Sequence, residues 1–344
     1  MEGKDKMEKF SEKRLLQAEA DFVLQIPSDR PVRILQVTDT QIIDASQRRY
    51  PERLSEKEIE AWQPTLVDER MTYYLDGAIE QTKPDLIVHT GDFVYGEFDD
   101  SGKMLERHIA IMEKYGIPWT LALGNHERET KLGVDRLCKA IESAPHCLFK
   151  SVNEVDGERL EGNGTFSILL ERDGVPSAIL YILDSGCGTA ECPGGIHERQ
   201  RKWLKATAKR YSGIPSYAYF HIGPLAGIRA AEKYGYRFEP FQPIAIEGKG
   251  DFGYWGERVF EQHCIDGDGS LMRLFEEIGV KGVFLGHFHK LSASMRYGAL
   301  RLTYGLKTGE YDSHLPDRLG GTLLQFPTDG EEGFSVEHIA IKKG

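Results

Sequence analysis

Several features are scarce or missing in this 344-residue sequence, and each absence excludes a class of protein. No apolar run approaches the roughly 20 residues that a membrane-spanning helix requires, so we expect no membrane role. Positive charge is in deficit, with 43 Lys and Arg against 54 Asp and Glu. The formal net charge of −11 argues against nonspecific nucleic-acid binding, so an anionic substrate would need local positive charge, such as that of metal ions.

Cysteines and targeting signals are sparse as well. The five cysteines form an odd set without a CxxC pair, which favours free thiols in a reducing compartment over a disulfide framework or a zinc ribbon: Cys138, Cys147, Cys187, Cys192 and Cys264. Cys187 and Cys192 lie close enough in sequence to bridge, but free thiols are the favoured interpretation. The opening residues, MEGKDKMEKFSEKRLLQAEADF, lack the continuous apolar segment of a secretory signal, so we expect a cytoplasmic protein.

Short apolar and β-branched runs alternate with amphipathic stretches, a pattern typical of the α/β class. Strands are predicted at 32–37, 86–90, 119–123, 166–170, 178–183, 217–220, 282–285, 300–303, 322–326 and 335–341, and helices at 12–20, 68–81, 103–115, 134–141, 198–211 and 271–278. No repeat or linker marks an internal boundary, so we expect a helical lead segment at 1–30 and one domain at 31–344. Residues 224–268 show little periodicity and are predicted to form a long loop insert.

Five of the predicted strands are followed directly by residues of the types that can bind metals. They are followed by Asp39, by Gly91-Asp92, by Gly124-Asn125-His126-Glu127, by His221, and by Gly286-His287-Phe288-His289. Because ligands in α/β sheets bind at the carboxyl ends of strands, we expect these five loops to converge. Each motif alone has an ordinary explanation, such as a turn or a cap, and only their joint occurrence in this order indicates a site.

Carboxylate, amide and imidazole groups together suit Mn, Fe, Zn or Ni better than Mg or Ca, which prefer oxygen ligands. The sequence offers more donors than one ion needs. Two ions about 3.5–4 Å apart, bridged by one carboxylate, would use the whole set and are common in phosphoester hydrolysis.

In this order the motifs resemble the calcineurin-like metallophosphoesterase superfamily, over roughly residues 32–310. Further segments resemble its purple-acid-phosphatase-like branch: Leu183-Asp184-Ser185-Gly186, Gln200, Trp203-Leu204 and Tyr304-Gly305-Leu306-Lys307-Thr308-Gly309. The resemblance implies a four-layer αββα sandwich with a dinuclear centre at the strand ends. The implied cofactors are two divalent or mixed-valence transition metals, Mn, Fe or Zn.

The resemblance also implies a role for each matching residue. Asp92 would bridge the two metals, the first metal would also be held by Asp39 and His289, and the second by Asn125, His221 and His287. His126 would contact the substrate phosphate or protonate the leaving oxygen, with Asn125 also at the substrate. Arg48 and Arg49 follow the first motif and are candidates for binding the substrate anion, although a solvated loop face is the ordinary alternative.

The implied activity is hydrolysis of a phosphomonoester or phosphodiester by a metal-bound hydroxide. The substrate would be a phosphorylated small molecule, a nucleotide or a phosphoprotein. Two alternatives from other classes are a scaffold that kept the fold but lost the chemistry, and a metal storage or redox protein. The second does not explain a His126 placed beside Asn125.

One position departs from the pattern of the family. Gln41 stands where most members carry a histidine that binds the first metal, and an amide is a weaker donor. Tyr95, three residues after Asp92, matches the spacing of the iron-binding tyrosine of purple acid phosphatases and is the alternative ligand. The competing interpretation is that Tyr95 only packs.

Overall fold

The computed structural model describes residues 20–47, 56, 64–189, 193–233, 244–246, 253–255, 264–327 and 333–343. In this part of the chain, two large mixed sheets carry most of the strands. The nine-stranded sheet has the order β1 (Phe22–Gln25), β7 (Phe166–Arg172), β8 (Val175–Ile182), β9 (Ser216–Tyr219), β12 (Val280–Leu285), β14 (Leu300–Tyr304), β13 (Leu291–Tyr297), β11 (Gly253–Trp255) and β10 (Ile244–Ile246). The five-stranded sheet has the order β16 (Ser335–Ala340), β15 (Gly320–Phe326), β2 (Val32–Val37), β3 (Leu86–Thr90) and β4 (Trp119–Ala122).

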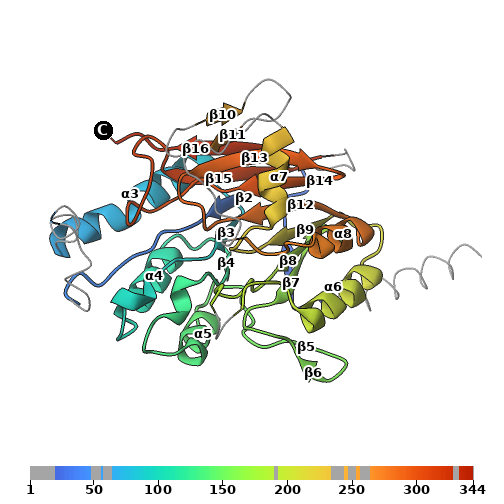
Figure 1. The fold of residues 1–344 in the computed structure, drawn as a ribbon, viewed down its shortest axis with the longest axis horizontal. Coiled ribbons are helices and arrows are strands. Elements are labelled where there is room, and N and C mark those ends of the chain that lie inside the picture. Colours follow the sequence, from blue (N-terminus) through green and yellow to red (C-terminus); the bar gives the residue numbers. More distant parts are fainter. Residues whose placement is uncertain are drawn as a thin grey trace, which may run out of the picture.

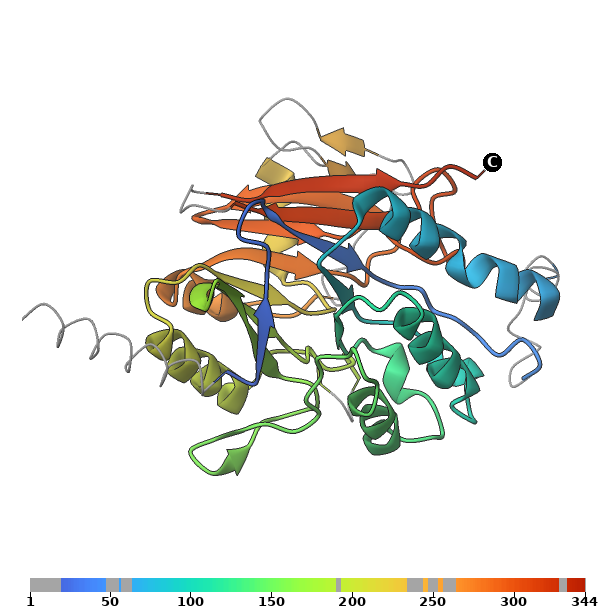
Figure 2. The ribbon, with the colours of Figure 1, turned by 180° about the vertical axis from the view of Figure 1, so that it is seen from behind.

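Helices cover the outer face of each sheet. They are α3 (Pro64–Thr82), α4 (Lys103–Glu113), α5 (Val134–Glu142), α6 (Glu198–Arg210), α7 (Leu225–Lys233) and α8 (Ser270–Glu277), with short 3-10 helices η2 (Gly96–Phe98) and η3 (His126–Arg128) and a separate pair of short strands, β5 (Glu154–Val155) and β6 (Glu158–Arg159). Figures 1 and 2 show α3, α4 and α5 on one side of the molecule and α6 and α8 on the other. None of the described helices combines the length and the apolar character needed to cross a membrane.

Alternating side chains of the nine-stranded sheet feed two separate cores. On β7, Phe166, Ile168 and Leu170 join the core that the two sheets share with α3, α4 and α5, whereas Leu169 joins the core under α6, α7 and α8. The same alternation on β12 places Phe284 between the sheets. The result is a four-layer αββα sandwich, which confirms the fold that the resemblance implied.

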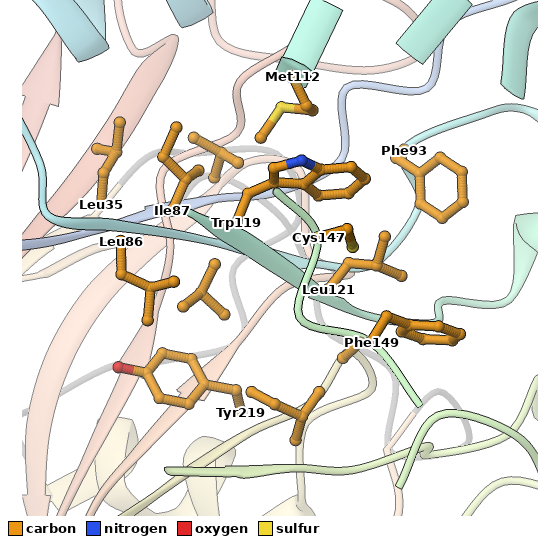
Figure 3. Packing of buried hydrophobic residues seen from close by; sticks show 14 of the residues in the cluster. Leu35, Leu86, Ile87, Phe93, Met112, Trp119, Leu121, Cys147, Phe149 and Tyr219 are labelled. Carbon is orange, nitrogen blue, oxygen red and sulfur yellow. The ribbon is translucent and has the colours of Figure 1, made fainter. Parts of the chain in front are cut away.

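The five-stranded sheet shows how one strand serves both of its faces. Ile87 and Trp119 point toward Met112 of α4, and Leu86 points to the side on which Tyr219 of the nine-stranded sheet lies (Figure 3). All five side chains are nearly inaccessible to solvent. Burial on both faces explains why β3, LIVHT, shows no alternation of apolar and polar residues.

Two predictions about organisation need correction. Residues 1–19 of the expected lead segment lie outside the described residues, and Phe22–Gln25 is a strand that pairs in parallel with β7. Its half-exposed edge position gives it a weak pattern in the sequence. The expected loop at 224–268 contains α7 and the strands β10 and β11, which extend the nine-stranded sheet. Helix α7 has nine residues, of which six are buried.

The prediction of five free thiols is also wrong. Cys187 is disulfide-bonded, whereas Cys138, Cys147 and Cys264 form no disulfide.

Candidate metal centre

The loops that follow five strands meet at one end of the sandwich. Strands β2, β3 and β4 run parallel in one sheet, as do β9 and β12 in the other, so their carboxyl ends lie at neighbouring edges. The backbone N–H of Asp39 donates to the carbonyl of Gly91 at 3.0 Å. The backbone N–H of His287 donates to Asp39 Oδ2 at 3.1 Å, which joins the loops of the two sheets.

Two groups of donor atoms form at this point, and they share Asp92. One group is Asp92, His221 and His287, and the other is Asp39, Asp92 and His289. Within each group the donor atoms all lie within 4.8 Å of one another. A carboxylate common to two compact donor sets is the arrangement that a bridging ligand requires.

His221 fixes the direction of one donor. Its Nδ1 lies 2.7 Å from the carbonyl oxygen of Thr90, and because a carbonyl only accepts, Nδ1 carries the hydrogen. Its Nε2 then faces two acceptors, Asp92 Oδ2 and Asn125 Oδ1, each at 3.1 Å. Only a proton or a cation between these atoms makes the contact favourable. Burial lowers the pKa of His221, but the charges of Asp92 and Asp39 together with the hydrogen bonds to Asp92 and Thr90 outweigh burial and raise it to about 9.

In each of the two buried aspartates, one carboxylate oxygen accepts a hydrogen bond and the other does not. Asp39 Oδ2 accepts from the Thr38 hydroxyl at 2.6 Å, and Asp92 Oδ1 accepts from the His126 backbone N–H at 3.0 Å. Asp39 Oδ1 and Asp92 Oδ2 accept no hydrogen bond from the described residues. An imidazole nitrogen lies close to each of them: His289 Nε2 is 3.4 Å from Asp39 Oδ1, and His221 Nε2 is 3.1 Å from Asp92 Oδ2.

These unpaired oxygens fit a cation. A carboxylate that is buried without a partner is costly, and a metal ion removes that cost. Burial would raise the pKa of both carboxyls, but the neighbouring histidines outweigh it and hold both pKa values well below the usual range. The donor set of two carboxylates, an amide and three imidazoles suits transition metals.

Glu127 ties the loop after β3 to the loop after β4. Its carboxylate accepts the backbone N–H groups of Gly124 at 2.5 Å, Asp92 at 3.2 Å, Phe93 at 2.7 Å and Val94 at 3.4 Å. Burial and the charge of Asp92 raise the pKa of Glu127 to about 7. The sequence places Glu127 in the Gly124-Asn125-His126-Glu127 motif but does not show that it acts through backbone amides.

His126 lies beside the donor groups and belongs to neither. Its Nε2 is 3.9 Å from Asp92 Oδ2, and its Nδ1 is 2.7 Å from Glu129 Oε2. Burial lowers the pKa of His126, but the charge of Asp92 and the bond to Glu129 raise it to about 9. The ring stacks on Tyr95, with centroids 4.1 Å apart and planes inclined by 28°. Ligation by Tyr95 stays a prediction, and Glu129 is a contact that the sequence pattern did not indicate.

Gln41 is fully buried, and its amide oxygen accepts a hydrogen bond. Lys307 Nζ donates to Gln41 Oε1 at 2.7 Å and to the backbone carbonyl of Asp39 at 2.8 Å. Lys307 belongs to the Tyr304–Gly309 motif, but nothing in the sequence joins it to Gln41. The candidate substrate ligands Arg48 and Arg49 lie outside the described residues.

Comparison with known proteins agrees with this geometry. A family model described as calcineurin-like phosphoesterase matches residues 32–291. The Arabidopsis thaliana protein named probable inactive purple acid phosphatase 14 is 29% identical over 303 residues, which cover 77% of this chain and 67% of that protein. Phosphatase DCR2 of Saccharomyces cerevisiae is 31% identical over 169 residues, which cover 45% of this chain and 29% of the yeast protein.

A solved structure shares the fold. The dimetal phosphatase from Danio rerio matches with a TM-score of 0.51 at 13% identity, over 88% of this chain and 94% of the fish protein. The family model covers well over half of the chain and includes the loops of all five motifs. The chain therefore belongs to the calcineurin-like phosphoesterase family.

Proposed function

We propose that this protein hydrolyses phosphate esters with two transition metal ions, Mn, Fe or Zn. The observation that carries the proposal is that two compact donor groups share the buried carboxylate of Asp92. The first ion would be held by Asp39, Asp92 and His289. The second would be held by Asp92, Asn125, His221 and His287.

When bound, such a pair of ions supplies a deprotonated water near neutral pH and neutralises charge on the phosphoryl oxygens. The protein supplies positioning and a proton. His126 would act at the leaving oxygen, because it is the imidazole that borders the donor groups without joining them. Despite burial, the charges of Asp92 and Glu129 raise the pKa of His126 to about 9, so both ring nitrogens carry hydrogens near neutral pH. Nδ1 then donates to Glu129, the ring stacks on Tyr95, and the N–H at Nε2 lies 3.9 Å from Asp92 Oδ2.

The substrate would be a phosphomonoester or phosphodiester of a small molecule, a nucleotide or a phosphoprotein. The charge balance of the chain supports a metal-based site for such an anion. The surface is acidic overall, with a formal net charge of −11, so attraction of a phosphate must come from local cations.

The test combines metal analysis with an assay panel of an aryl phosphate, a bis-aryl phosphate and nucleotides. We expect up to two transition metal ions per chain and turnover of at least one substrate class. Asp92→Asn should lower turnover by about 10³-fold or more, because one substitution weakens both ion positions. Asp76→Asn, which removes a carboxylate that pairs with Lys114, is the matched control. Turnover that survives Asp92→Asn would contradict the two-metal mechanism.

A catalytically inactive scaffold is the second candidate. Two observations favour it: the Arabidopsis relative carries the word inactive in its name, and Lys307 occupies the oxygen of Gln41. A scaffold of this kind would bind metal without hydrolysing any substrate of the panel, or would bind none.

A further inference from the structure

Lys307 places a buried positive charge against the loop that carries Asp39 and Gln41. Its side chain is only 1% exposed, yet its ammonium contacts no carboxylate oxygen within hydrogen-bonding distance among the described residues. It bonds instead to two carbonyl groups, the backbone oxygen of Asp39 and the side-chain oxygen of Gln41. In the low effective dielectric of the interior, a buried ammonium acts more strongly on nearby charges than an exposed one does.

The segment around Lys307 is fixed against the first-motif loop. The backbone N–H of Thr308 donates to the Thr38 carbonyl at 2.9 Å, and the Thr38 N–H donates to Thr308 Oγ1 at 3.1 Å. At Gly309 a Cβ atom would lie 2.1 Å from the carbonyl oxygen of Thr40, so only glycine permits this approach. The backbone on both sides of this contact is therefore fixed, and the Lys307 side chain that spans it is buried.

The bond to Lys307 makes Gln41 a poor metal donor. The ammonium takes one of the two lone pairs of Oε1 and its charge disfavours a cation at the other, while Nε2 has no lone pair to offer. The first ion position then has three donor residues, Asp39, Asp92 and His289. The second position has Asp92, His221 and His287 and, in addition, the amide oxygen of Asn125. The first position also carries the repulsion of a nearby ammonium.

We infer that Lys307 makes the two ion positions unequal, by withdrawing Gln41 from coordination and by repelling the ion at the position of Asp39 and His289. This inference rests on the proposed function, because it requires that the centre binds two ions. The inference adds that the first position binds its ion more weakly than the second. The fraction of chains with an ion at the first position would then depend on the free metal concentration.

The test is a Mn²⁺ titration of the full chain after a chelator has removed its metals. Binding is measured by calorimetry and by the electron paramagnetic resonance signal of free Mn²⁺. We expect two classes of one ion each, with dissociation constants that differ by at least about tenfold. Asp39→Asn should weaken the weak class and Asn125→Ala the tight class. Lys307→Met should tighten the weak class by about tenfold, and Lys114→Met, a surface substitution of the same charge change, should not.

Gln41→Met separates the two possible roles of the glutamine and keeps the test valid if Lys307→Met fails to fold. A glutamine outside the coordination shell predicts a change of less than about threefold in either class. Weakening of the weak class by tenfold or more would show that Gln41 is a ligand and would overturn the inference. Two sites of equal affinity would overturn it while leaving the proposed function intact, and absence of any Mn²⁺ binding would contradict both.

Discussion

Gly124 is the position at which the smallest substitution should disturb the centre most. A Cβ atom at Gly124 would lie 2.2 Å from Asp92 Oδ1 and 2.5 Å from the Asp92 backbone nitrogen, whereas real Cβ contacts essentially never fall below 3.0 Å. Gly124→Ala must therefore displace Asp92 by close to 1 Å. Overpacking of this kind costs about 1–3 kcal/mol. Weakening the charged hydrogen bond from the His126 N–H to Asp92 Oδ1 adds about 1.5–3 kcal/mol.

We therefore expect Gly124→Ala to lower the free energy of unfolding by about 2.5–6 kcal/mol, as measured by equilibrium urea denaturation. Both classes of Mn²⁺ site should weaken, since both use Asp92. Gly267→Ala is the matched control, because a Cβ atom there would meet no described atom within 4 Å. A Gly124→Ala protein within about 0.5 kcal/mol of the wild type, with unchanged Mn²⁺ affinity, would refute the reasoning.

Two further predictions concern buried charge away from the metal donors. Arg128 donates to Asp184, whose side chain is 2% exposed, so Arg128→Met should cost about 3 kcal/mol in urea denaturation, and Asp184→Asn on that background should cost less than it does alone. Burial holds the pKa of His108 well below its ordinary value of 6.5, so the unfolded chain binds one more proton than the native chain below about pH 6.5, and stability falls with falling pH. His108→Leu should flatten that slope by up to about 1.4 kcal/mol per pH unit in denaturation curves between pH 6.5 and 5, and an unchanged slope would contradict the assignment.

The sequence predicted strands best where both faces are buried. The predicted bounds of β2 and β3 agree with the structure, because these central parallel strands are almost fully buried and rich in Val, Ile and Leu. Strand β13, with the sequence LSASMRY, was missed. Its buried serines bond to neighbours on adjacent segments, as Ser294 does to Thr303 and Ser292 to Arg318, so polar residues occupy positions that a periodicity argument reserves for apolar ones.

The metal-donor residues of the centre could be predicted from the sequence for a related reason. Each follows a recognisable strand directly, and parallel strands place their carboxyl ends at a common edge. The contacts that Lys307 and Glu129 make at the centre could not be predicted in this way. The contact from Lys307 to Gln41 joins residues 266 positions apart, and no local pattern in either segment requires it. Contacts of this kind depend on how the two sheets are stacked.

Backbone conformation at the centre depends on the same stacking. Asp39, Gln41, Asp92 and His287 all have positive φ, between 47° and 75°, and each costs on the order of 1 kcal/mol outside glycine. The opposing contributions are long-range: the backbone N–H of Asp39 bonds to Gly91, that of Gln41 to Asp92, and that of His287 to the Asp39 carboxylate. At about 1 kcal/mol net for each bond, these contacts roughly offset the strain. Because the His287 bond crosses from one sheet to the other, the donor residues reach these conformations only when both sheets of the sandwich are assembled.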